Sequence, residues 1–258
     1  MNIIVCIKQV PDTADIKLDG ATKKLLREGI KGMINPFDMY AIEEGLRLKD
    51  KLGGKVTALT MGPSGAESAL REAIALGCDE AVLLCDPAFA GSDTLATSYV
   101  LSCAIKKIKD YDIILCGKQA LDGDTAHVGP GIAGHLDISQ IVNVRKIQDI
   151  KEGSVSAQRM TEYGYDVLES QLPCLLTVVK DINVPRLPSL KGKMKAKSAT
   201  ISGWKAADIA AEEARIGLKG SATEVLKVTT PPARPQGKIF EGEGAVDGLV
   251  EALKGLMK

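Results

Sequence analysis

Short apolar runs alternate with longer amphipathic segments along the first half of the chain. The apolar runs predict strands over residues 3–7, 55–61, 80–85 and 111–116. The segments between them carry apolar residues at helical spacing and predict helices over residues 37–52, 66–76 and 94–108, with another helix starting near Pro130. Strands separated by helices are typical of βαβ units, so the pattern predicts an α/β fold with a parallel sheet covered on both faces.

A β-hairpin is predicted after residue 149, where the alternation of strands and helices stops. Runs over residues 154–160 and 165–170 flank the turn Glu162-Tyr163-Gly164, and another apolar strand follows over residues 172–179. We therefore expect the hairpin to be added to the parallel sheet.

The chain after Val184 has little apolar sequence of its own. Prolines and basic residues come first, and a weakly amphipathic pattern over residues 203–220 favours a helix. A Pro-rich stretch then leads to a final helix over residues 246–257. Such a tail cannot bury a core by itself. We therefore expect an α/β domain over residues 1–200 and a C-terminal arm over residues 201–258 that packs on a partner chain.

Composition and charge restrict the class of protein. The 258 residues carry 33 basic and 33 acidic side chains, and the zero net charge gives no electrostatic basis for binding nucleic acid or an acidic membrane. Aromatic residues make up 3%, too few for a platform that stacks bases. The N-terminus has no signal-peptide pattern and no apolar stretch is long enough to span a bilayer, so we expect a cytoplasmic protein without membrane insertion.

Neither the cysteines nor the histidines follow a metal-binding pattern. The six cysteines show no CxxC spacing, and we interpret them as small buried residues in a reducing compartment. The only histidines are His127 and His135, without clustered ligands, and no Ser–His–Asp order stands out. We therefore predict no metal site and no catalytic residue.

Residues 112–134 form the strongest candidate site. They read DIILCGKQALDGDTAHVGPGIAG, a strand followed by a small-residue loop and a helix start. The first N–H groups of a helix lack partners and the helix dipole adds positive charge there, so this order predicts an anion site. The glycines at 117, 123, 129 and 131 are expected to let the main chain approach a ligand. Because the loop has neither GxGxxG nor the P-loop motif, an ordinary capped βα loop is the alternative.

Three strand ends are expected to meet beside this loop. Residues 6–8, 60–62 and 116–118 follow the first, second and fourth predicted strands. Ligands of open parallel sheets bind beyond the carboxyl ends of the strands, near the switch in strand order. The sequence therefore predicts one crevice at this edge.

Four separated blocks resemble the β subunit of electron transfer flavoproteins. The blocks are CIKQVPD, NPFDMYAIEEGLRLK, GKQALDGDTAHVGP and PRLPSLKGKMKAK. They occur in the order typical of that family, and the resemblance covers nearly the whole chain. It implies a Rossmann-like sheet of the adenine nucleotide α-hydrolase type, and pairing with an α subunit that carries the electron-transferring flavin.

The loop DGDTAHVGP resembles the electron-bifurcating branch of that family, although His127 stands where such relatives commonly have Gln. The resemblance implies FAD in this chain, NADH as electron donor, and two acceptors. One is ferredoxin or flavodoxin, and the other is a dehydrogenase of the acyl-CoA or lactate type, reached through the α-subunit FAD. Two alternatives stay open: a non-bifurcating electron carrier that holds structural AMP, and a free-standing nucleotide-binding stress or signalling module. As a bifurcating or a non-bifurcating electron transfer flavoprotein, the chain would be a redox subunit rather than an enzyme by itself.

The residues that would bind the nucleotide follow from the same resemblance. At the adenosine end they are Cys6, Lys8, Asn35, Pro36, Phe37, Asp38 and Met61. Around the phosphates they are Gly117, Asp122, Gly123, Asp124, Thr125, Ala126, His127, Val128, Gly129 and Pro130. Each of these residues also has a plainer interpretation. Residues 35–38 are typical of a helix start. Lys8 is compatible with an ordinary surface lysine, and Asp122 and Asp124 are typical of a turn.

The basic stretch near residue 190 resembles the family's recognition loop for partner dehydrogenases. Leu190 with Met194 and Lys195 would contact the partner, an exposed leucine acting as the anchor and the basic residues as a steering rim. A solvated basic turn is the alternative.

Overall fold

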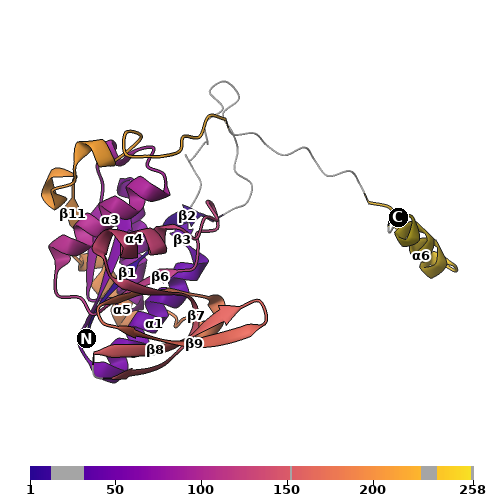
Figure 1. Ribbon diagram of the computed structural model, residues 1–258, viewed down its shortest axis with the longest axis horizontal. Helices are drawn as coiled ribbons and strands as arrows, with labels where there is room; N and C mark the ends of the chain where they lie inside the picture. Colours follow the sequence, from indigo (N-terminus) through magenta and orange to yellow (C-terminus); the bar gives the residue numbers. More distant parts are fainter. Residues whose placement is uncertain (13–31, 152, 228–236, 257–258) are drawn as a thin grey trace.

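A nine-stranded sheet forms the centre of the chain, shown as a computed structural model in Figure 1. The structure describes residues 1–12, 32–151, 153–227 and 237–256. The strand order is β11-β5-β4-β1-β6-β10-β7-β8-β9. The strands are β1 (Asn2–Cys6), β4 (Lys55–Met61), β5 (Glu80–Leu84), β6 (Ile113–Gly117), β7 (Ser139–Lys151), β8 (Ser154–Thr161), β9 (Gly164–Gln171), β10 (Cys174–Val178) and β11 (Ser202–Trp204).

Helices cover both faces of the parallel part of the sheet. They are α1 (Pro36–Leu52) and α2 (Glu67–Leu76) on one face and α3 (Thr94–Ile108) and α4 (Val128–Leu136) on the other. Side chains alternate across a strand, and β1 accordingly sends Ile3 and Val5 to one core and Ile4 and Cys6 to the other. The predicted Rossmann-like α/β fold is confirmed.

The antiparallel hairpin is also confirmed. Strands β8 and β9 pair around the turn at residues 162–163, with Thr161 opposite Gly164. Strand β7 connects this hairpin to the parallel sheet, because its first half runs parallel to β10 and its second half antiparallel to β8. A second, two-stranded sheet consists of β2 (Gln9–Pro11) and β3 (Gly32–Ile34).

The helix expected over residues 203–220 is absent. Ser202–Trp204 instead forms the edge strand β11 beside β5, and single 3₁₀ turns follow at Ala207–Ile209 and Glu213–Arg215. Ile209 and Ile216 are buried against the α3 face. This segment therefore packs on the sheet of its own chain. Its apolar residues are buried one at a time and do not form one face of a helix.

Two further helices follow the sheet. Helix α5 (Leu190–Ser198) occupies the stretch that was expected to be an irregular loop, and helix α6 (Ala245–Leu256) lies away from the sheet in Figure 1. Val246, Leu249, Val250 and Leu253 of α6 have exposed side chains. Among the described residues, no helix has the length and apolar character needed to cross a membrane.

Candidate functional site

The three predicted strand ends lie side by side. Strand β1 stands between β4 and β6, with Cys6 opposite both Leu59 and Cys116. All three strands are parallel, so their carboxyl ends share one edge of the sheet, and the predicted convergence is confirmed.

Asn35 connects this edge to the loop after β6. Its backbone N–H donates to the Lys8 carbonyl at 2.8 Å. Its side-chain amide donates to the Gln119 carbonyl at 2.8 Å and accepts from the Leu121 N–H at 3.1 Å. The amide is buried, so each of these bonds is costly to leave unmade. The backbone and side chain of one residue thus hold the loop against the start of α1 and the segment after β1.

Asp38, in the first turn of α1, lies beneath the same edge. Its carboxylate accepts the Lys8 N–H at 2.7 Å and also hydrogen-bonds to the backbone of Gly117. Burial raises the pKa of Asp38 to about 7, although the hydrogen bonds from Asn35, Lys8 and Gly117 act in the opposite direction. Asp38 therefore joins two strand ends and titrates near neutral pH.

Lys8, which follows β1, forms an ion pair with Asp122 in the loop after β6. The Lys8 ammonium donates to both carboxylate oxygens of Asp122, at 2.6 and 2.8 Å. The side chain of Asp124 accepts a hydrogen bond from Gln119. The two aspartates therefore pair with side chains of neighbouring residues, Lys8 and Gln119.

The loop over residues 122–127 has an unusual backbone. Asp124 and Ala126 adopt left-handed conformations, with φ of 51° and 57°. This region is unfavourable for a residue with a Cβ, less so for aspartate, whose side chain can hydrogen-bond locally, than for alanine, and such strain concentrates at functional sites. Helix α4 follows directly, and its N-cap residue His127 makes no capping hydrogen bond with its side chain. Helix α4 thus begins beside an exposed loop and without a side-chain cap, an arrangement that suits an anion at its N-terminus.

The glycines of this region have a different role from the one we predicted. A Cβ on Gly117 would lie 2.3 Å from an Asp38 oxygen, and one on Gly129 would lie 2.7 Å from Thr177 Cγ2. Gly131 would meet the Ser98 hydroxyl at 2.6 Å. At these three positions the protein itself fills the space, so close packing is the reason for glycine. Of the four glycines predicted to approach a ligand, only Gly123 is open, with the Lys8 ammonium 4.0 Å from its Cβ position.

Two thiols lie near the carboxyl ends of β1 and β6. Cys6 and Cys116 are buried partners on β1 and β6, and both are free. The hydrogen bond with Cys6, followed by burial, holds the pKa of the Cys116 thiol well above its ordinary range. Both thiols therefore serve as small apolar packing groups. Pro36, Phe37 and Met61 are partly exposed around them.

The remaining predicted site residues lie in the loop or on α5. Asp122, Gly123, Asp124, Thr125 and His127 are exposed, Ala126, Val128 and Pro130 are partly buried, and Gly129 is buried.

Leu190 and Met194 lie one turn apart on α5, and 78% and 66% of their surfaces are exposed. The Lys195 ammonium donates to the Cys78 carbonyl instead of standing beside these two residues.

Some contacts of the site escaped prediction. The backbone of Gln119 and Leu121 binds Asn35 across more than 80 positions of sequence, and no local pattern indicates such a bond. The left-handed conformation at Ala126 is likewise invisible in the sequence, because alanine does not favour it. Within the described ranges, no group of three or more His, Cys, Asp or Glu side chains could hold a metal ion.

Taken together, the sheet edge and the loop define an α/β protein with a candidate ligand site at the carboxyl ends of its strands. The family model for the electron transfer flavoprotein domain matches residues 22–209. The chain is 50% identical to an electron transfer flavoprotein subunit beta of Thermoanaerobacterium thermosaccharolyticum, over 98% of both chains. It is 48% identical to the subunit of that name in Megasphaera elsdenii, over 98% of both chains.

A further relative is the caffeyl-CoA reductase-Etf complex subunit CarD of Acetobacterium woodii. Identity is 45%, over 94% of this chain and 92% of the relative. The chain belongs to the electron transfer flavoprotein family, as a β subunit.

Proposed function

We propose that this chain is the FAD-holding β subunit of an electron-bifurcating electron transfer flavoprotein that works in the cytoplasm. The observation that carries the proposal is the exposed loop at residues 122–127, strained at Asp124 and Ala126, which leads into the N-terminus of α4 beside Lys8. Near full-length similarity to electron transfer flavoprotein β subunits supports it.

The residues present fit a dinucleotide. The N-terminus of α4 and the loop N–H groups provide donors for phosphate oxygens. Lys8 adds a cation whose present partner, Asp122, is itself exposed and able to rotate away. Partly exposed Phe37 and Met61 provide apolar surface for a ring system. The nucleotide would lie across the edge formed by β4, β1 and β6.

When bound, FAD would supply the redox chemistry: acceptance of a hydride from NADH, then donation of one electron to ferredoxin or flavodoxin and of the other, through the FAD of the α subunit, to a dehydrogenase. The chain itself binds and orients. Asn35 and Asp38 hold the loop and the strand ends in place, and α4 aims its positive end at the phosphates. The chain is thus a redox subunit rather than an enzyme by itself.

The C-terminal arm, residues 201–258, would pack on the α subunit. Its described part up to residue 223 already packs on the sheet, whereas α6 exposes Val246, Leu249, Val250 and Leu253. A helix with such a row of exposed apolar residues is stabilised by a partner surface. The α subunit is the occupant that the family implies.

The partner dehydrogenase would bind at α5, through Leu190 and Met194. Both side chains are large, apolar and exposed. One relative is named as a subunit of a caffeyl-CoA reductase-Etf complex, which favours an acyl-CoA type of dehydrogenase over a lactate type.

The identity and number of bound nucleotides test the proposal. The chain is produced with its α subunit, the purified complex is denatured, and the released nucleotides are separated and counted. Two FAD for each heterodimer, with oxidation of NADH, would support bifurcation. One FAD and one AMP would replace it with the simple electron carrier, and a homo-oligomer that binds ATP without flavin would point to the stand-alone module.

Lys8→Met provides the matching test of the site, with Lys55→Met as its control. Both lysines form exposed ion pairs with a carboxylate. Lys55 pairs with Glu80 at the amino-terminal ends of β4 and β5, away from the candidate site. Exposed pairs contribute about 1 kcal/mol or less, so both variants should fold. Loss of FAD in the first variant alone would support the assignment, and equal retention in both would contradict it.

A further inference from the structure

Four apolar side chains stand exposed on and before α5. We call Val184, Leu187, Leu190 and Met194 the α5 surface. Residues 184–199 contain one arginine, four lysines and no acidic residue. A partner suited to this surface has an apolar pocket surrounded by carboxylates. The α5 surface is the one that the proposed function assigns to the dehydrogenase, and the inference below rests on that assignment.

Helix α5 is too weak to hold itself in place. It has nine residues, including Gly192, and Ala196 is its only buried side chain. Helices this short are marginal unless packing supports them. The Ser189 hydroxyl caps its start by accepting the Gly192 N–H at 2.9 Å, and a Cβ on Gly192 would lie 2.1 Å from the Ala75 carbonyl of α2. The helix therefore lies directly on α2, although almost no apolar area attaches it there.

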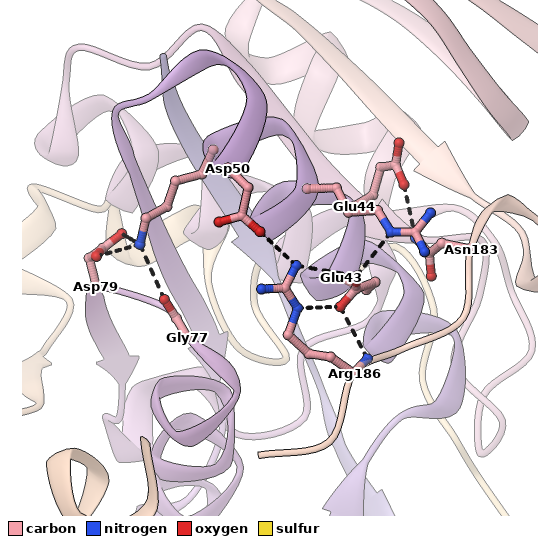
Figure 2. A network of polar contacts seen from close by, with 9 residues as sticks. Glu43, Glu44, Asp50, Gly77, Asp79, Asn183 and Arg186 are labelled. Atoms are coloured by element: carbon pink, nitrogen blue, oxygen red, sulfur yellow. Dashed lines mark hydrogen bonds and ion pairs between the residues drawn. The ribbon is translucent and has the colours of Figure 1, made fainter. Parts of the chain in front are cut away.

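A polar anchor holds the segment just before α5 (Figure 2). Arg186 donates to Glu43 from its backbone N–H at 3.1 Å and from its Nε at 2.8 Å, and to Asp50 from its Nη2 at 2.9 Å. Asn183 donates to Glu44 at 2.9 Å and to the Tyr40 carbonyl at 3.0 Å. All of the acceptors belong to α1.

Glu43 is the centre of this anchor, and only 5% of its side chain is exposed. Burial acts to raise its pKa, but hydrogen bonds from Arg186, and then from Arg47, outweigh burial, and the pKa lies below its ordinary value. Glu43 is therefore ionised at neutral pH. A buried carboxylate of this kind strongly favours one position of its cationic partner, and so of the chain that carries Arg186.

A second anchor holds the other end of α5. Arg71 of α2 donates from Nη1 to the Ala196 carbonyl at 2.6 Å and to the Ala199 carbonyl at 3.3 Å. The last carbonyls of a helix lack intrahelical partners, and a cation is favourable there. Lys195 donates to the Cys78 carbonyl at 3.1 Å, so it too attaches α5 to the end of α2. Both ends of α5 are thus held by charged groups of other helices.

We propose that Arg186 and Arg71 are positioning residues that hold α5 in its docking geometry in the free protein. They leave every apolar side chain of the α5 surface exposed and fix the backbone that carries it. A partner then binds a preformed surface and does not have to order nine residues, which would lower its affinity.

The test uses the purified complex of this chain with its α subunit and three variants. Arg186→Gln and Arg71→Met each remove one anchor. Arg47→Gln is the matched control, because Arg47 pairs with the same Glu43 at 2.9 Å but forms no ion pair with the described segment before α5. Arg71 is partly exposed, so its variant should fold even if Arg186→Gln does not. The electron acceptor is a purified acyl-CoA dehydrogenase or lactate dehydrogenase, whichever the parent complex reduces.

Both anchor variants should raise the KM for the dehydrogenase by about tenfold and leave kcat and NADH oxidation with an artificial acceptor unchanged. Hydrogen exchange of residues 190–198 should become faster in the same variants and stay at the parent rate in the control. Unchanged exchange and KM in both would overturn the proposal. An equal loss of activity with the artificial acceptor would do so too, because it would indicate general damage.

Leu190→Ala separates this inference from the function on which it rests. If this variant leaves the KM for the dehydrogenase at the parent value, the α5 surface is not the docking site and that part of the proposed function fails. The hydrogen-exchange comparison still decides whether the two arginines hold α5.

Discussion

Replacing Asp38 with asparagine should change how the stability of the protein depends on pH. The Asp38 carboxyl has a pKa of about 7 in the folded protein, raised from 3.8 mainly by burial. Between these values the folded chain keeps a proton that the unfolded chain has lost. The free energy of unfolding therefore falls as pH rises from about 4 to about 7, and the Asp38 contribution is constant outside this window.

The size of the effect follows from the two pKa values. At about 1.4 kcal/mol for each pH unit, the interval from 3.8 to about 7 corresponds to about 4 kcal/mol of stability lost through ionisation of Asp38. An asparagine side chain cannot ionise, so the Asp38→Asn variant lacks this contribution. Its amide oxygen can still accept one of the two backbone hydrogen bonds, and the loss of the other adds a constant cost of about 1 kcal/mol.

Urea unfolding of parent and variant, followed by circular dichroism, measures the difference. We expect the stability of the variant relative to the parent to be about 4 kcal/mol more favourable near pH 8 than near pH 4. Other groups, including Glu43, titrate equally in both proteins and cancel. If the free energy of unfolding differed between variant and parent by the same amount at both pH values, Asp38 would not titrate in this range and the reasoning would be refuted.

Three further changes have defined outcomes. Gly129→Val should push α4 away from Thr177, cost about 1–3 kcal/mol and empty the nucleotide site, as counted from released nucleotides, whereas Gly134→Val, with open space around its Cβ, should do neither. Lys193→Glu should slow electron transfer to the dehydrogenase and make its rate less dependent on ionic strength, as stopped-flow kinetics at two salt concentrations would show. Leu249→Asp on α6 should weaken association with the α subunit, as measured by analytical ultracentrifugation, and an unchanged dissociation constant would exclude α6 from that interface.

Four neighbouring strands of the parallel sheet could be predicted because the local sequence of each one indicates a strand. Residues 3–7, 55–61, 80–85 and 111–116 are predominantly apolar, as expected of strands buried on both faces. Strands β7 and β11 could not be predicted in this way. Polar residues interrupt β7, and β11 has three residues whose only strand signal is pairing with β5.

Helix α5 was missed for a related reason. Its sequence, LKGKMKAKS, has almost no apolar face, and its apolar residues point to solvent. Charged groups of α1 and α2, more than 100 positions away in sequence, hold it in place. Hydrophobic periodicity indicates a helix only when one face of that helix is buried. A helix held in place by hydrogen bonds does not need an apolar face and therefore lacks this pattern.

For the candidate site, the sequence by itself determined which strand ends and which loop meet at one edge of the sheet. Three parallel strands must end at one edge, and the small-residue loop after β6 must stand there. Only the tertiary structure decided how the parts fit. It paired Lys8 with Asp122, tied Asn35 to the loop backbone and placed Asp38 under Gly117, which gave that glycine a packing role. The alternation of strands and helices in the sequence implies that the strands run parallel. Contacts between segments far apart in the sequence depend on the path of the chain between them, which no local pattern specifies.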